Sequence, residues 1–385
     1  MLQHPQHDAL TALRHKLHQH PDLSGQEQDT AARITAFLKQ YAPDALLTGL
    51  GGTGVAAVFK GEAPEKGPVL LFRAELDGLP IAETNAHLAH RSVRDGRGHQ
   101  CGHDGHMTML AGLASLLHRQ RLKTGQVILL YQPAEETGAG ALALLQDKRF
   151  TALHPDYVFG LHNLPGLPLH QVVVRQEVFA AASTGMVVEL QGSSSHAAEP
   201  EKGVNPGAAM AALILALNQV MANKAQFQDL ALLTVIHARL GEVAFGTNPG
   251  FATVMATMRA FRPQDFQLLK QLVQEAVAQV ANSYAIPYTI RFVEEFPATV
   301  NDAGAVRIVQ QAAQRLGLDV TEAAQPFRWS EDFGHLTHTY TGAFFGLGSG
   351  TEQPQLHHAD YDFPDELIPT GAHLFYTIAQ ELQNS

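Results

Sequence analysis

The order of elements predicted from about residue 183 onward constrains the fold more than any other feature of the sequence. Strand-like and helix-like hydrophobic patterns follow one another there as β-α-β-β-α-β. The segments are MVVELQG, PGAAMAALILALNQVMA, ALLTVIHARL, ATVMATMRAF, PQDFQLLKQLVQEAVAQVANSYA and YTIRFVEEF. This order is the split βαβ signature of a self-sufficient two-layer domain. We therefore expect residues 182–294 to form a ferredoxin-like α+β domain that is inserted into a larger one.

The residues on both sides of this insertion have the pattern of an α/β domain. Continuous apolar runs such as GVAAVF (54–59) and VILLY (127–131) alternate with amphipathic stretches such as 106–119. Buried strands and the helices that cover them produce this alternation. We expect residues 1–181 and 295–385 to form one discontinuous domain, with a largely parallel sheet flanked by helices.

Composition excludes several kinds of partner. The formal net charge is −11, from 26 Lys and Arg residues against 37 Asp and Glu residues. Nucleic acid and anionic membranes both attract basic surfaces, so neither is an expected partner. The N-terminus lacks the basic and apolar regions of a signal peptide, and no run of about 18 apolar residues could span a bilayer. We expect a cytoplasmic protein.

Side chains suited to metal binding or acid–base chemistry follow the apolar runs of the larger domain. These residues are Asp77, Glu135 and Glu136, His162, and His357 with His358. The segment HQCGHDGH (99–106) holds Cys101, the only cysteine of the chain, and His103 just before a predicted helix. Ligand sites in open α/β sheets lie beyond the carboxyl ends of the strands, so we expect these segments to converge.

The residue types in these segments fit one metal chemistry. Thiolate, imidazole and carboxylate together suit zinc or a similar divalent ion. Two adjacent glutamates repel each other, so their presence together suggests that they have different roles. One of them can ligate metal while the other acts as a base. The convergence therefore predicts a metal-dependent hydrolytic site.

Each residue also has a plainer interpretation when it is taken alone. His162 could be a surface histidine, since the chain has 21 histidines, and Cys101 could be a small buried apolar side chain. The histidines of LRHKLHQHPDL (13–23) resemble a metal site, but we interpret them as solvated residues at a helix end. The joint occurrence of the segments, rather than any single residue, carries the prediction.

A series of longer motifs adds a family resemblance that covers nearly the whole chain. The motifs are RHKLHQHPDLSGQE, RAELDGLPIAE, HQCGHDGHMTMLAGLA, YQPAEETGAGA, GLHNLPGLP, SSSHAAEPEKGVNP, FGTNPGFATVMATMRAF, WSEDFG, FFGLGSG and LHHADYDFPDE. In this order they resemble the M20 metallopeptidase family. The similar branch is that of hippurate hydrolases, N-acyl-L-amino acid amidohydrolases and plant auxin-conjugate hydrolases.

The resemblance implies a catalytic domain with an inserted lid or dimerisation domain, a homodimer, and two divalent metal ions per subunit, which could be zinc, manganese, nickel or cobalt. The implied metal ligands are Cys101, His103, Glu136, His162 and His357. The implied base is Glu135, and Asp77 is the acid that supports the site. The implied lid residues are His196, which stabilises an oxyanion in its own or the partner subunit, and Asn248 and Arg259, which bind substrate.

The implied reaction is hydrolysis of a small-molecule N-acyl amino acid into a carboxylic acid and a free amino acid. Neither the acyl group nor the amino acid follows from the sequence. The alternatives are a dipeptidase or carboxypeptidase of the same fold, a non-catalytic metal-binding protein, and a cysteine hydrolase with Cys101 as nucleophile.

The chain departs from the family pattern at two places. Glu75 stands where the first strand motif usually has aspartate, which lengthens a carboxylate near the site. The approach to His196 is Ser193, Ser194 and Ser195, where a glycine is common. Because serine tolerates a positive φ less well than glycine, the conformation of this loop is an open question.

Overall fold

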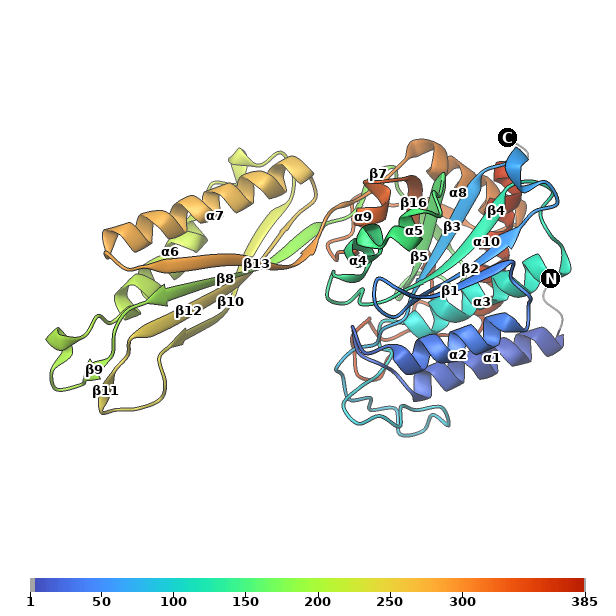
Figure 1. Cartoon of the computed structure of the whole chain (residues 1–385). Coiled ribbons are helices and arrows are strands. Elements are labelled where there is room, and N and C mark those ends of the chain that lie inside the picture. The colour runs from blue at the N-terminus through green and yellow to red at the C-terminus, as the bar shows by residue number, and fades with distance from the viewer. Residues whose placement is uncertain (1–3, 384–385) are drawn as a thin grey trace. The chain divides into compact units, whose positions relative to one another are not determined.

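The computed structural model describes residues 4–383, which form two compact units. The larger unit consists of Met1–Phe179, Thr299–Gln325 and Asp332–Ser385, and the smaller unit of Ala180–Ala298 and Pro326–Glu331. Nothing in the sequence pattern indicated that the short segment Pro326–Glu331 joins the smaller unit. Figure 1 labels most of the elements of both units.

The larger unit is built on an eight-stranded sheet with the order β1-β2-β4-β3-β5-β16-β6-β15. The strands are β1 Ala45–Leu50, β2 Gly54–Lys60, β3 Val69–Glu75, β4 Gln126–Gln132, β5 Tyr157–Leu164, β6 Val172–Val174, β15 Val320–Glu322 and β16 Thr341–Gly348. The central strands β4, β3, β5 and β16 are parallel to their neighbours in that group, while β1 and β2 are antiparallel additions at one edge. This arrangement confirms the predicted α/β fold and brings four carboxyl ends to one edge of the sheet.

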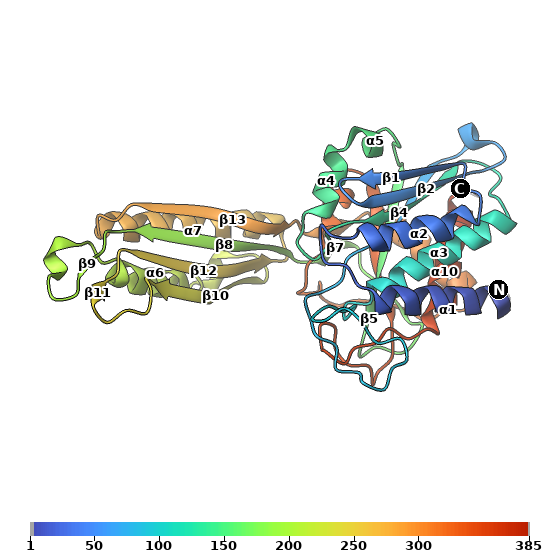
Figure 2. The same ribbon diagram turned by 60° about the horizontal axis from the view of Figure 1, so that its bottom comes forward.

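Three other long helices of the larger unit pack against α3, whose first fifteen residues are all buried. The longer helices are α1 His4–Gln19, α2 Gln28–Lys39, α3 His103–Arg119, α8 Ala303–Arg315 and α10 Leu367–Gln383, and the short ones are α4 Gly140–Gln146, α5 Lys148–Thr151 and α9 Gly334–Thr337. Figures 1 and 2 show α1, α2 and α3 side by side, and α3 also contacts α10 and β3. The N-terminus of α3 is therefore held from several sides.

The smaller unit has the predicted β-α-β-β-α-β order. Its elements are β8 Ala182–Gln191, α6 Gly207–Val220, β10 Ala231–Leu240, β12 Phe251–Ala260, α7 Pro263–Ser283 and β13 Tyr288–Phe296. They form an antiparallel sheet with the order β10-β12-β8-β13, packed against α6 and α7. Strand β12 alternates buried and more exposed residues, as expected for a sheet that is covered on one face.

Two short ribbons complete the described fold. In the smaller unit, β9 Ser195–His196 pairs with β11 Thr247–Asn248. The other ribbon joins β7 Glu177–Ala180 to β14 Thr299–Asn301. No helix in the described part of the chain is long and apolar enough to cross a membrane.

The close approach of α3 and α10 gives a test of the packing. A Cβ added at Gly371 would lie 2.1 Å from Met109 Sδ. Alanine favours a helix by about 1 kcal/mol over glycine, but overpacking a core costs about 1 to 3 kcal/mol. We expect Gly371→Ala to lower the melting temperature, and the double variant with Met109→Ala to lose less than the two single effects combined. A higher melting temperature for Gly371→Ala alone would contradict this packing.

Candidate metal centre

The structure brings the predicted ligand atoms together at the carboxyl edge of the large sheet. Among the described residues, five sets of side chains each have one ligand atom within 4.8 Å of the others, and three of them consist of predicted site residues alone: Cys101, His103 and His162; Cys101, Glu136 and His357; and His103, Glu135 and Glu136. Cys101 and His103 lie at the start of α3, His162 lies in β5, and the glutamates follow β4. His357 lies in the loop after β16, where it adopts a left-handed φ of 65°. The five predicted ligands therefore form one cluster.

Backbone carbonyls orient the two buried histidines toward this cluster. His103 donates from Nδ1 to the carbonyl oxygen of Asp77 at 2.9 Å, and His162 donates from Nδ1 to that of Asn163 at 2.9 Å. Because a carbonyl oxygen can only accept, Nδ1 carries a proton in each ring, and Nε2 is the nitrogen that faces the other ligand atoms. His162 Nε2 lies 3.4 Å from Cys101 Sγ.

Two polar atoms in the cluster are buried without a hydrogen bond, which tests whether the residues fit a cation. They are His103 Nε2 and Glu136 Oε1, which lie 3.8 Å apart. Buried polar atoms normally have partners, and a divalent cation would satisfy an imidazole nitrogen and a carboxylate oxygen at once. Together with a thiol and further imidazoles, this donor set fits zinc or a similar ion.

Burial and neighbouring charges shift the pKa values of the ionisable side chains in the cluster. Burial lowers the pKa of His103, but the Glu75 carboxylate and the contact with Asp77 outweigh it and raise that pKa to about 10. Burial and the Asp77 carboxylate raise the pKa of Glu136 to about 7, against the effect of His103. Burial holds the pKa of His162 well below its usual value. A cation would replace protons on His103 and Glu136, so its affinity should increase with pH.

Asp77 contacts both His103 and Glu136, but it is not part of the sets of potential ligands described above. Its Oδ2 accepts hydrogen bonds from Glu136 N at 3.0 Å and from Ser24 Oγ at 2.7 Å. Its carbonyl oxygen orients His103, as described above. Asp77 is thus placed to support His103 and Glu136 rather than to act on substrate.

Glu75, which stands where the family motif usually has aspartate, lies close to His103 of the cluster. It forms an ion pair with Arg73, and its Oε2 lies 2.8 Å from His106 Nδ1. The opposite nitrogen of His106 contacts Asn163 Oδ1 at 2.5 Å. The longer side chain therefore supports the site through His106. Sequence patterns alone do not single out Arg73 or Asn163, because neither is a residue type that usually binds metal.

The interpretation of residues 13–23 as a helix end with solvated histidines is wrong for His18. His18 is fully buried, with Nδ1 2.9 Å from Asp104 Oδ2 and Nε2 3.3 Å from Glu83 Oε1. Burial lowers its pKa, but these carboxylates outweigh burial and raise the pKa to about 9. Since Asp104 follows His103 directly, α1 helps to fix the start of α3.

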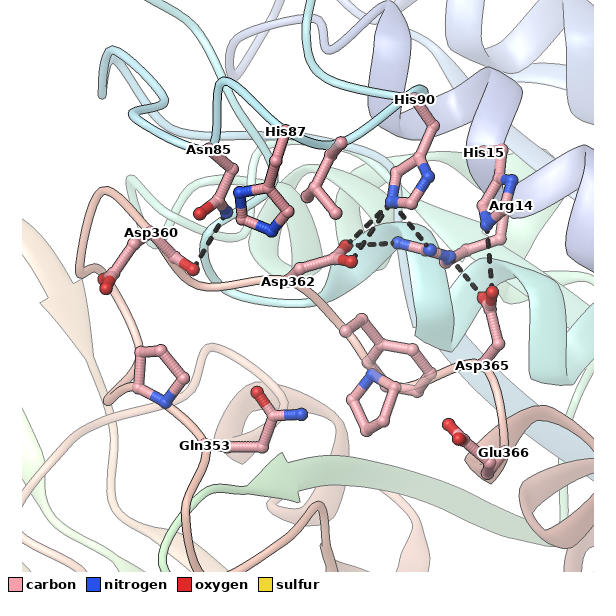
Figure 3. A pocket seen from close by; sticks show the side chains of 14 residues that line it. Arg14, His15, Asn85, His87, His90, Gln353, Asp360, Asp362, Asp365 and Glu366 are labelled. Carbon is pink, nitrogen blue, oxygen red and sulfur yellow. Dashed lines mark hydrogen bonds and ion pairs between the residues drawn. The ribbon is translucent and has the colours of Figure 1, made fainter.

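Arg14 extends this support to the loop that carries His357. Its guanidinium contacts Asp104 at 3.3 Å, Asp362 at 2.6 Å and Asp365 at 2.6 Å. Arg14 lines a cavity of about 550 Å³. Figure 3 shows Asp362 and Asp365 turned toward Arg14. Arg14 therefore ties α1 to the segment just after His357.

His196 and Asn248 lie on the β9–β11 ribbon of the smaller unit. His196 is exposed, and its Nδ1 accepts a hydrogen bond from Ala198 N at 3.0 Å, so the neutral ring carries its proton on Nε2. Asn248 is buried, and its amide bonds Asn205 at 2.8 Å and Ser195 Oγ at 3.0 Å. In this structure Asn248 therefore braces the loop of His196, and its predicted contact with substrate stays a prediction.

The three serines before His196 need no unusual backbone conformation. None of Ser193, Ser194 and Ser195 has a positive φ. The loop is closed instead by paired backbone hydrogen bonds between Ser193 and Val204, at 3.0 and 2.8 Å. The absence of a glycine here consequently introduces no strain of that kind.

Arg259 lies near the other end of β12 from this ribbon. Its two hydrogen bonds with other described residues both leave from Nη1, to the carbonyl oxygen of Arg328 at 3.0 Å and to Ser330 Oγ at 2.9 Å. The edge formed by Nε and Nη2 keeps the geometry that pairs with a carboxylate. Eight residues of extended strand separate Arg259 from Phe251, so it lies about 25 Å from the ribbon end of the sheet.

Comparisons with known proteins agree with this fold. The model of peptidase family M20/M25/M40 matches residues 71–381. An N-acetylcysteine deacetylase of Bacillus subtilis is 30% identical over 97% of this chain and 96% of its own, and a hippurate hydrolase of Campylobacter jejuni is 30% identical over 95% and 94%. The crystal structure of Bacillus subtilis YXEP, described as a dinuclear metal binding peptidase, superposes with a TM-score of 0.81 at 27% identity and covers 98% of both chains. The chain belongs to peptidase family M20/M25/M40.

Proposed function

We propose that the protein is a metal-dependent amidohydrolase that cleaves the amide bond of N-acyl amino acids. The observation that carries this proposal is a set of five ligand side chains with an additional carboxylate, Glu135, beside them. Relatives named for the deacetylation of N-acetylcysteine and the hydrolysis of hippurate support this substrate class. The products would be a carboxylic acid and a free amino acid.

Cys101, His103, Glu136, His162 and His357 would hold two divalent cations, as the description of YXEP as dinuclear supports. Bound cations would polarise the amide carbonyl and lower the pKa of a water molecule. The donor set admits zinc, manganese, nickel or cobalt, because all four accept imidazole and carboxylate.

Glu135 would act as the general base. Its carboxylate is nearly buried, and Oε2 lies 4.0 Å from His103 Nε2, so it borders the ligand cluster. It would take the proton from the attacking water and return it to the nitrogen of the leaving amino acid. Its neighbour Glu136 faces the same cluster at 3.8 Å from His103, which suits a ligand.

The smaller unit would supply the groups that recognise the rest of the substrate. His196 would donate from Nε2 to the oxygen that gains negative charge, a contribution of about 3 to 4 kcal/mol for a well-placed donor. Arg259 would bind the carboxylate of the amino acid through Nε and Nη2. His196 lies on the ribbon that precedes β12, and Arg259 lies near the far end of β12, about 25 Å away, so one copy cannot offer both to a substrate of this size. We therefore propose a homodimer in which His196 acts in the partner's site.

A cysteine hydrolase is a second candidate, because Cys101 Sγ lies 3.4 Å from His162 Nε2. The same thiol is also within ligand distance of Glu136 and His357, which a thiol nucleophile would not need. The other alternative is a dipeptidase of the same fold. A panel of N-acyl amino acids and dipeptides, assayed with each cation and after chelation, separates these candidates. Activity that persists after chelation would refute metal dependence.

The adjacent glutamates allow a matched comparison. We expect Glu135→Gln to keep wild-type cation binding and to reduce kcat by at least about 100-fold, because it loses the general base. We expect Glu136→Gln to weaken cation binding, because it loses a ligand. Metal content by mass spectrometry and kcat measured on the same preparations would check both. Retained turnover in Glu135→Gln would refute its role as base.

Subunit mixing tests the proposed place of His196. His196→Ala should lower kcat by about 100-fold, as expected for the loss of one oxyanion donor, and leave metal content unchanged. Co-refolding or co-expression of His196→Ala with Glu135→Gln should restore activity that neither variant has alone, because one site of each mixed dimer keeps both groups. If the mixture stays inactive while mixed dimers form, His196 acts in its own subunit or not at all.

A further inference from the structure

A single buried carboxylate, Asp332, holds both ends of the turn that carries Glu135 and Glu136. We call residues 133–140 the glutamate turn; it joins Gln132, the last residue of β4, to the start of α4. Asp332 is fully buried, and its Oδ1 and Oδ2 accept hydrogen bonds from Gln132 Nε2 at 2.7 and 2.8 Å. Its Oδ2 also accepts from Ala141 N at 2.9 Å. One side chain thus fixes the residue before the turn and the residue after it.

The glutamate turn requires such restraint because its backbone is strained. Ala134 has a φ of 49°, a left-handed conformation that a residue other than glycine seldom adopts. Such a conformation costs on the order of 1 to 3 kcal/mol and persists only where the surroundings determine it. The turn also closes tightly, since a Cβ at Gly140 would lie 1.6 Å from Pro133 O. Displacement of either end would therefore move the two glutamates.

Arg73 completes the support from the far side of Asp332. Its Nη2 donates to Asp332 Oδ1 at 2.8 Å and its Nε donates to Gln132 Oε1 at 3.1 Å. Every hydrogen bond that Asp332 makes among the described residues is one that it accepts, and one donor is cationic. An asparagine in this place would present an NH₂ group to a donor, so it could not reproduce the arrangement.

We propose that Asp332 is a positioning residue for catalysis, which sets the places of Glu135 and Glu136 through the two ends of the glutamate turn. This inference rests on the proposed roles of those two residues. Groups that support metal ligands or a base in this way typically change affinity or activity by about 10- to 100-fold when they are replaced. A displacement of about 1 Å at a reacting group can cost a similar factor in rate.

The test compares Asp332→Asn with two other variants. Gln132→Met removes the amide that donates to Asp332 but leaves the bonds of Asp332 with Arg73 and Ala141. This variant therefore tests the positioning role of Asp332 if Asp332→Asn does not fold. The matched control is Asp265→Asn in the smaller unit, a buried carboxylate that accepts two backbone hydrogen bonds, from Gln228 N and Asp229 N. The readouts are Zn²⁺ affinity by competition with a chromophoric chelator, kcat and KM with an N-acyl amino acid, and the melting temperature.

We expect Asp332→Asn and Gln132→Met to weaken Zn²⁺ binding by about 10- to 100-fold and to lower kcat at saturating metal by a similar factor, with KM near that of the wild type. Asp265→Asn should lower the melting temperature alone. Wild-type Zn²⁺ affinity and kcat in folded Asp332→Asn, or equal losses in the control, would overturn the proposal. If the wild type hydrolyses no substrate yet Asp332→Asn still loses Zn²⁺ affinity, the proposed function fails and the positioning role stands.

Discussion

The burial of many ionisable groups at one edge of a sheet is the constraint on which the rest of the larger unit depends. Isolated buried charges cost several kcal/mol each, so every such group needs a partner. The structure provides those partners on the side away from the cluster, with the carbonyl of Asp77 behind His103, that of Asn163 behind His162, and Arg73 beside Glu75. The atoms that face the centre are thereby kept for a cation.

The convergence of the ligand residues could be predicted because parallel strands end at one edge of their sheet. The supporting residues could not, because their partners are remote in sequence and their types are common. The sequence pattern predicts that His18 is a histidine at a helix end, because its partner Asp104 lies 86 positions away. Asp332 lies 200 positions from Gln132, and only the fold brings the two together.

In the smaller unit, the sequence identifies candidate substrate-binding residues but not the distance between them. The family resemblance assigned both Asn248 and Arg259 to substrate binding, and the sequence cannot say how far apart two positions on one sheet lie. The structure places them near opposite ends of β12 and uses the Asn248 amide to brace the loop before His196. The proposed recognition of one substrate by both residues would therefore require two copies of the unit.

The N-terminal helices limit how far this protein can be truncated. The family match begins at residue 71, yet the site draws on side chains that precede it. Arg14 and His18 hold Asp104, Ser24 holds Asp77, and Glu27 accepts from Ala134 N at 2.9 Å. A minimal fragment defined by the matched region would keep all five proposed ligands in its sequence and still lack the side chains that hold them in place. The boundaries of a recognisable family and of a working active site are therefore different in this chain.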